Sequence, residues 1–545
     1  MSPLTEMHVF SSNPSRTQAR QRHAGAGPQR RLPVLAVALA ALWLAGCTVG
    51  PDYVAPTPTT PETYHDLART TGNVNDSSPV ASEPDPAWWR NFNDPLLDTL
   101  VERAIAGNLS LQQAVLRIAE SREQVTQSGA AGLPTVSAGA RATRQQLGLQ
   151  GILDSQHIGE RAEALSPEAN GVLGQLTQPV NLYQVNFDAS WELDLFGKVR
   201  RSVEAAQAAQ QQSIEDRNDG LVSLEAEVAR AYLQLRGAQA IAQLLATQIR
   251  LSEDTVALTR NRQQNGLAPQ SDVENASAQL AGLRAQLPSY EAQTRQAMNG
   301  LAVLLGQAPG TLDAELALPA GQVVLPAVPP AVPVGIPAAL ARRRPDIRRA
   351  EATLHQATAS IGVSIAQLFP SLSLTGQFGM RNSQASYLTR WASHFYSFGP
   401  SVSLPIFQGG RLVSNVRLSR AQQAEAVLGY RQAVLDALRE VENGLVAYRT
   451  DQDRVRALDA SLAAQQNNFD LASESYRKGL VSFINVIDAQ RQLTDTQQQV
   501  ANARVQLSTD LVSLYKALGG GWQPYQDVTL PQYKVFGPAG QVTPQ

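Results

Sequence analysis

The chain has 545 residues, several times the length of a typical domain, and this predicts several domains or one elongated body. The formal net charge is −2, which excludes the large basic field of nucleic-acid-binding proteins. Aromatic residues make up only 6% of the chain, while Ala, Gln, Leu, Ser and Arg are frequent, so the composition favours long helices over a compact enzyme core.

Histidine and cysteine are scarce: the chain has six His and one Cys. No two histidines stand at a metal-ligand spacing, and a single cysteine cannot form an internal disulfide. No nucleophile–base pair or Gly-rich phosphate loop appears either. We therefore expect no metal, no cofactor and no enzymatic activity.

The amino terminus has the pattern of a bacterial export signal. Basic residues are followed by an apolar run at 32–44, shorter than the roughly 20 residues of a transmembrane helix. The sequence Leu44-Ala45-Gly46-Cys47 resembles a lipobox, which implies cleavage after residue 46 and acylation of Cys47. Thr48, rather than Asp, follows the cysteine, and this points to the outer membrane. The alternative is an ordinary exported protein with a chance cysteine.

The mature chain contains an internal repeat. NGLAPQSDVENASAQL aligns with KGLVSFINVIDAQRQL, so that Gly266 matches Gly479, 213 positions later. Upstream, Leu133-Pro134-Thr135 matches Phe369-Pro370-Ser371 at a larger separation, so the first copy has extra residues, which we expect in an enlarged loop at 147–178. Each copy has a helical stretch, two alternating segments and two long helical stretches. The expected organisation is a signal peptide, an anchored N-terminal segment, a first repeat, a Pro-rich linker, a second repeat and a tail, at 1–46, 47–92, 93–306, 307–337, 338–520 and 521–545.

The alternating segments predict four β-strands, two in each copy. From Tyr183 to Leu195 every odd position is apolar and every even position is polar. Similar alternation begins at Val136, at Leu372 and at Tyr396. Strands of about ten residues with one apolar and one polar face are typical of transmembrane barrels. A soluble sandwich with one wet face would show the same pattern, but the export signal and the small number of strands count against it.

The remaining long stretches predict coiled-coil helices. Apolar residues recur with a 3,4 spacing from Leu221 to Ile249 and again from Val434 to Leu462. No proline falls between 199 and 268 or between 410 and 521. About 60 helical residues would make a rod on the order of 90 Å, long enough to extend across the periplasm. A cytoplasmic coiled coil would explain neither the strands nor the lipobox.

Four strands cannot close a barrel. An open sheet in lipid would leave two rows of backbone groups without hydrogen bonds, each costing several kcal/mol. The chain is therefore expected to share a barrel with copies of itself. Two copies would give eight strands, whose interior side chains fill, whereas three would give twelve and an open pore.

Several motifs then resemble one known family. They are CTVGPDYVAP (47–56), PAWWRNFNDPLLDTLV (86–101), WELDLFGKVR (191–200), RRRPDIRRAE (342–351), LPIFQGGRL (404–412) and KGLVSFINVIDAQRQL (478–493). Together they are similar to the TolC-like outer-membrane factors, in particular to the NodT-type lipoprotein branch. The resemblance implies an α+β membrane protein: a homotrimer with a twelve-stranded β-barrel, four strands from each chain, continued by a long periplasmic α-helical barrel. It also implies a periplasmic membrane-fusion adaptor and an inner-membrane pump, most often of the RND type.

The resemblance further implies a gate at the periplasmic helix tips. Positions matching the family's gate are Asp488, Ile484 one turn before it, Asn485, and the pair Asp272 and Tyr476, in which some members bond the Asp to the Tyr. Val481 stands where the best-known member has an arginine, so this gate should depend more on apolar contact. The alternative is that Asp272 and Asp488 are solvated acids near helix starts, where acids are favourable.

Two glycines are expected to shape the tips between paired helices. Gly266 and Gly479 stand between the long helical stretches, and glycine adopts positive φ at no steric cost.

The sequence thus predicts a passive exit duct for small molecules. Metal-ion efflux and type I protein secretion remain alternatives, because both use the same kind of outer component. A surface enzyme on a coiled-coil stalk would need a catalytic cluster, and a lipid-anchored spacer would not need polar strand faces.

Overall fold

The computed structural model describes residues 48–531 except 59, 68–77, 147, 149–150, 153–154, 159–177 and 319–326. The chain divides into the units Met1–Cys47 and Thr48–Gln545, and all described elements belong to the second. The expected signal peptide, Cys47 and most of the expected loop at 147–178 lie outside the described residues. Within the described part, none of the helices has the length and apolar character needed to cross a membrane.

The second unit contains one series of elements twice. The first series is α3 (Leu109–Ala130), β2 (Thr135–Gln145), β3 (Val180–Leu193), α7 (Lys198–Gln264) and α8 (Gln270–Leu304). The second series is α11 (Pro345–Ala366), β5 (Ser371–Asn382), β6 (His394–Ser403), α12 (Arg411–Arg477) and α13 (Phe483–Leu518). Both α7 and α12 have 67 residues, so each rod is about 100 Å long.

Shorter elements lie before, between, within and after the two series. They are β1 (Ser78–Val80), η2 (Trp88–Phe92), α2 (Pro95–Gly107), α9 (Asp313–Leu316), β4 (Ala331–Pro333), η3 (Pro337–Ala339), α10 (Leu340–Arg343), η4 (Ala385–Tyr387), η5 (Trp391–Ser393) and η6 (Gln523–Tyr525). β1 and β4 pair as a parallel two-stranded sheet. Neither strand was predicted from the sequence. The many prolines around β4 indicated a linker, but proline is also tolerated at the ends and edges of strands.

The four long strands form one antiparallel sheet in the order β2-β3-β5-β6. Its register places the predicted apolar residues on a single face: Phe187 lies opposite both Ala138 and Phe378, and Phe378 lies opposite Tyr396. The predicted polar residues occupy the other face, together with Leu182 and Phe395. β2 and β6 each lack a partner on one side within the described chain, so the sheet has two open edges.

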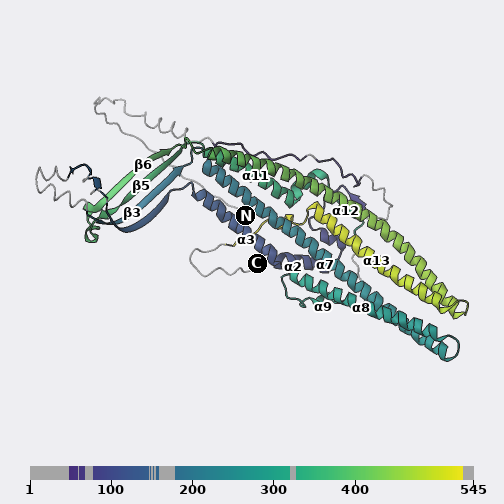
Figure 1. Ribbon diagram of the computed structural model, residues 1–545. Coiled ribbons are helices and arrows are strands. Elements are labelled where there is room, and N and C mark those ends of the chain that lie inside the picture. Colours follow the sequence, from purple (N-terminus) through teal and green to yellow (C-terminus); the bar gives the residue numbers. More distant parts are fainter. Residues whose placement is uncertain are drawn as a thin grey trace, which may run out of the picture. The chain divides into compact units, whose positions relative to one another are not determined.

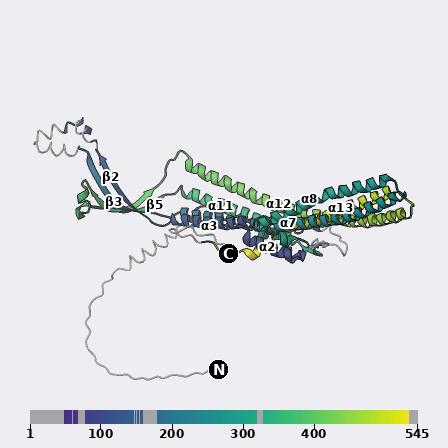
Figure 2. The same cartoon turned by 90° about the horizontal axis from the view of Figure 1, so that it is seen from below.

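The long helices pair within each copy, α7 with α8 and α12 with α13. α11 packs against both α7 and α12, whereas the extensive contacts of α3 are with α7. Figure 1 shows the sheet at one end of the long helices and the turns between the paired helices at the other. Figure 2 shows the same arrangement from below.

The main hydrophobic core lies where η2 and α2 pack against the long helices. Trp88 stacks on Tyr515 with their ring centroids 5.1 Å apart. Pro95 opens α2, and the Asp94 side chain accepts a hydrogen bond of 3.0 Å from the N–H of Leu96. The Tyr232 hydroxyl of α7 donates to the same Asp94 carboxylate at 2.6 Å, so one residue both caps α2 and fixes it to the rod.

Candidate functional site

The two turns between the paired helices have the same geometry. Gly266 and Gly479 have φ values of +70° and +74°. In each turn the glycine N–H bonds a carbonyl three residues back, and the next N–H bonds one five residues back, as in Leu267 N to Arg262 O at 2.8 Å. This is the Schellman termination of a helix, in which glycine takes the left-handed position. Both predicted tip glycines thus lie at the ends of α7 and α12.

The predicted gate residues lie at the start of α13, directly beyond the second turn. Ile484, Asn485 and Asp488 are exposed, and Ile484 and Asp488 are one helical turn apart on the same side. Asp488 makes no ion pair or hydrogen bond with any described residue. Val481 is only half-buried, and it packs against the apolar cluster beneath the tip instead of extending from it. The exposed side therefore combines one apolar residue with one free carboxylate.

Tyr476 belongs to that apolar cluster at the end of α12. Its ring lies 5.2 Å from the Phe483 ring, and the Arg262 guanidinium of α7 lies 4.6 Å above it. The Tyr476 hydroxyl is buried and has no hydrogen-bond partner among the described residues. The Asp272–Tyr476 bond that the family resemblance implied is thus not formed within this chain. Arg262 was not predicted as a site residue, because only the fold brings it to Tyr476.

The charges around Tyr476 are linked through Arg262. Burial raises the pKa of the Asp272 carboxyl, and the nearby Arg262 opposes that shift. Burial also raises the pKa of the Tyr476 hydroxyl; Arg262 lowers it and the Asp272 charge raises it further. Arg262 is therefore the cation that both groups share, and it connects the first helix pair to the second.

The polar face of the sheet carries a hydrogen-bonded row of side chains. Arg381 Nε donates to Gln184 Oε1 at 3.0 Å, and Gln184 Nε2 donates to Asn186 Oδ1 at 3.1 Å. Asn186 donates in turn to Asp188, which also accepts from Gln377 Nε2 at 2.7 Å. At one end of the row the Arg381 guanidinium also lies 4.6 Å over the Phe395 ring. Since the polar groups satisfy one another's hydrogen bonds, the face is suited to line water.

The arginine-rich motif at 342–351 stabilises the packing between helices. Arg344 is buried, donates to the carbonyl of Ala517 at 2.7 Å and forms ion pairs of 2.7 Å with Asp346 and Glu440. Arg348 pairs with the fully buried Glu215 at 2.7 Å. These contacts connect α11 to three long helices, so the motif holds the middle of the molecule together.

A carboxyl pair lies between α12 and α13. Asp451 and Asp510 share a hydrogen bond, and burial together with that bond raises the pKa of Asp510 to about 7. The surrounding polar groups are Arg454, whose Nη1 is 4.0 Å from Asp451, and Gln506, which donates to Asp510 at 2.8 Å. Two acids this close share one proton.

Replacing the Asp510 carboxyl by a neutral group should change how the free energy of unfolding depends on pH. In the folded state the pair keeps a proton up to about pH 7, whereas an unfolded Asp loses it near 3.9. Stability is therefore highest at low pH and falls as the pH rises through 7. Asp510→Asn should therefore raise the apparent unfolding temperature more at pH 8 than at pH 5, the difference being equivalent to about 1–2 kcal/mol after allowance for solvent screening. Thermal unfolding of the detergent-solubilised protein at both pH values measures this.

The exposed Asp495 on the same helix provides a control, since Asp495→Asn should give the same change at both pH values. An Asp510→Asn difference that is equal at pH 5 and pH 8 would contradict the shared proton.

Comparison with known proteins agrees with this architecture. A family model described as "Outer membrane efflux protein" matches residues 100–307 and 336–520. The probable efflux pump outer membrane protein TtgC of Pseudomonas putida is 32% identical over 509 residues, 93% of this chain and 99% of the relative. Nodulation protein T of Rhizobium leguminosarum bv. trifolii is 32% identical over 488 residues, 89% of this chain and 96% of the relative.

A solved structure shows the same fold. The outer-membrane channel OprN superposes with a TM-score of 0.76 at 33% sequence identity, covering 88% of this chain and all of the channel. The predicted resemblance, the TolC-like fold and the outer-membrane location are thereby confirmed. The chain belongs to the outer membrane efflux protein family and is an efflux channel subunit with the TolC-like fold, located in the outer membrane and extending into the periplasm.

Proposed function

We propose that three copies of this chain form a passive duct through which small molecules leave the cell. The observation that carries the proposal is the four-stranded sheet, which has one apolar face, one polar face and two open edges. β6 of one copy pairs with β2 of the next, because an open edge in lipid leaves backbone groups without hydrogen bonds. Twelve strands then enclose a water-filled lumen, whereas eight would be filled by side chains.

The internal repeat supports this assembly through the helices. α11 packs between α7 and α12, so the equivalent helix α3 should pack between α7 and the α12 of a neighbouring copy. Glu215 and Val222 of α7, on the side facing α11, are 0% and 3% exposed. Their α12 counterparts Leu428 and Leu435 are 64% and 59% exposed. Large apolar side chains left open at positions that are buried in the other copy indicate a missing partner helix.

The amino terminus supports attachment to the membrane. Thr48, the first described residue, lies against Gly197 where α7 begins next to the sheet. Cys47 directly precedes this residue in the sequence, and two or more acyl chains on that cysteine would give stable anchoring.

The duct takes its substrate from other components. The names of several relatives describe toluene, solvent and antibiotic efflux pumps, and this supports small molecules as cargo here. The helix turns, where Leu267 and Leu480 are exposed, offer the surface for a periplasmic adaptor, and an RND-type pump at the inner membrane supplies the energy. The duct itself needs no catalytic step. Metal-ion or protein export would use the same channel, and transport assays with those cargoes distinguish them.

Planar-bilayer recording tests the duct and its gate. The purified protein should give discrete conductance steps, whereas a spacer without a pore gives none. Three copies of Asp488 and Ile484 would form a ring at the tips, where carboxylates favour cations. Asp488→Ala should therefore lower the preference for cations and raise basal conductance severalfold, because a small side chain replaces the carboxylate.

Asp470→Ala removes an exposed carboxylate from α12 and should leave both quantities unchanged. Unchanged conductance and cation preference in Asp488→Ala would contradict the role of Asp488 in the gate. That result would not contradict the proposed duct.

A further inference from the structure

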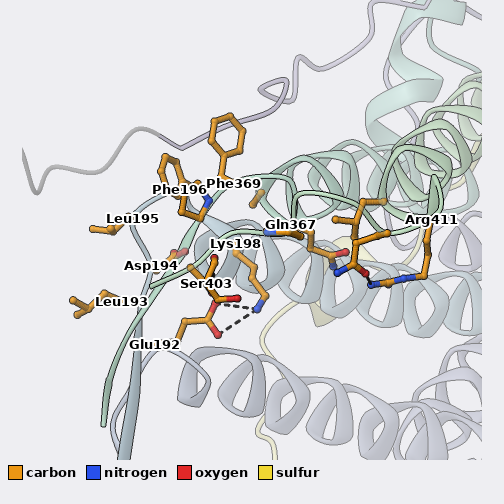
Figure 3. Close-up of a pocket in the computed structure, with 16 residues that line it drawn as sticks. Glu192, Leu193, Asp194, Leu195, Phe196, Lys198, Gln367, Phe369, Ser403 and Arg411 are labelled. Atoms are coloured by element: carbon orange, nitrogen blue, oxygen red, sulfur yellow. Dashed lines mark hydrogen bonds and ion pairs between the residues drawn. The ribbon is translucent and has the colours of Figure 1, made fainter. Parts of the chain in front are cut away.

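A cavity of about 320 Å³ lies where the sheet meets the helices (Figure 3). It is lined by the ends of β3, β5 and β6, the end of α11 and the first turns of α7 and α12. Its charged lining residues are Glu192, Asp194, Lys198 and Arg411. Its volume falls within the range of pockets that bind small molecules.

In the first copy, every positive group at this junction has a carboxylate partner. Lys198 Nζ pairs with Glu192 at 3.0 Å, shown by the dashed lines in Figure 3. The Asp194 carboxylate accepts from the backbone N–H groups of Val199 at 3.1 Å and Arg200 at 3.0 Å. Asp194 thus occupies the positive N-terminal end of α7.

In the second copy both carboxylates are missing. Arg411 and Lys198 are the first residues of two helices of equal length. With Phe407 aligned to Phe196, Ser403 replaces Glu192 and Pro405 replaces Asp194. The second copy has two extra residues between this phenylalanine and the start of its long helix, so Arg411 is the counterpart of Lys198 by its place at the helix start.

The positive groups of the second copy are left without a counter-charge. Arg411 donates to Gln408 Oε1 at 2.7 Å and has no ion pair among the described residues. No described side chain accepts from the N–H groups of Leu412 and Val413, the counterparts of Val199 and Arg200. Arg411 therefore has no carboxylate partner among the described residues, although it lies next to a helix N-terminus whose first N–H groups no described side chain caps.

We propose that this cavity is an anion subsite of the duct. It takes a small molecule with a carboxylate or phosphate group, which binds Arg411 and the start of α12 in the way that the Asp194 carboxylate binds the start of α7. Ser403 and Gln408 supply neutral hydrogen-bonding groups, and the aromatic side of the cavity at Phe369 accommodates an apolar body. The proposal rests on the proposed duct for the route by which the ligand arrives.

The register of the sheet indicates that the ligand comes from the lumen. Ser371 lies opposite Ser403, and Glu192 lies opposite Ser373, all on the polar face. Figure 3 shows Leu193 and Leu195 pointing away from Glu192 and Ser403. A lipid phosphate has the same chemistry as a soluble anion but would have to reach the site from the apolar face.

Binding to the purified full-length protein in detergent tests the site without requiring conduction. Benzoate and inorganic phosphate serve as probes in equilibrium dialysis. Arg411→Gln should weaken benzoate binding roughly tenfold, the typical effect of losing one charge-assisted contact. Ser403→Glu should weaken it similarly by restoring the carboxylate that the first copy has. Arg420→Gln, which removes an exposed arginine from the same helix outside the cavity, should change nothing.

Equal benzoate affinity in the unaltered protein and in both cavity variants would overturn the subsite, whatever the channel does in bilayers. Absence of conductance with intact benzoate binding would instead contradict the duct. In nanodiscs, benzoate displaced by phosphatidylglycerol but not by phosphatidylcholine would overturn the lumenal route, and we expect neither lipid to compete.

Discussion

Arg344→Ala is expected to lower the free energy of unfolding by about 3 kcal/mol. The guanidinium is buried and donates to the carbonyl of Ala517 at the end of α13, so its removal leaves that helix end without a partner. It also leaves Asp346 and Glu440 close together without the cation that neutralises both. The loss should appear as a fall of several degrees in the apparent unfolding temperature and a lower yield of folded protein.

Arg349→Ala is the matched control, because it lies on the same helix and pairs with Asp216 at 2.9 Å, with both side chains about half exposed. Exposed pairs contribute roughly 0–1 kcal/mol, so the control should unfold close to the unaltered protein. Similar destabilisation by the two variants would show that the arginine-rich motif acts through its total charge and not through the buried contacts of Arg344.

Replacing Leu428 and Leu435 together with Glu should prevent assembly of the proposed trimer. Both side chains project from the face of α12 that corresponds to the α11-binding face of α7. Burying two carboxylates against the α3 of a neighbouring copy costs several kcal/mol for each charge, which exceeds what an apolar contact supplies. We expect sedimentation in detergent to show monomers in place of trimers, with helical content retained.

Leu471→Glu serves as the control for charge on an exposed leucine of α12. Leu471 is 65% exposed and its counterpart in the first copy, Leu258, is also exposed at 50%, so neither position indicates a buried contact. This variant should remain trimeric. A trimer formed by the Leu428→Glu, Leu435→Glu protein would show that the two copies of the repeat do not pack equivalently.

The strands could be located from the sequence because their signal is local. The alternation from Tyr183 to Leu195 covers most of β3, and residues two apart share a face in any extended strand. The register then brings the apolar faces of all four strands together, with Phe187 opposite Phe378. The long helices were equally accessible, since their 3,4 spacing repeats over many turns.

The contacts of the candidate site could not be predicted because they join residues far apart in the chain. Arg262 lies over Tyr476, and Asp451 bonds Asp510, yet no spacing rule relates either pair. The resemblance to the family placed Asp272 near Tyr476 but could not show that Arg262 is the cation nearest to both. Arg411 became informative only when the structure showed which carboxylates its counterpart Lys198 and the start of α7 use.

The equal length of α7 and α12 has a consequence for any docking partner. Both rods start at the sheet and stop after the same number of turns, so their ends reach the same depth. Three subunits would then present six helix turns at the same depth, two from each copy, with nearly hexagonal spacing. The only symmetry axis that relates the three copies would be threefold. Six identical adaptor hairpins could bind all six loops. Three hairpins would have to distinguish the two kinds of loop, which differ at the equivalent positions Ala268 and Val481.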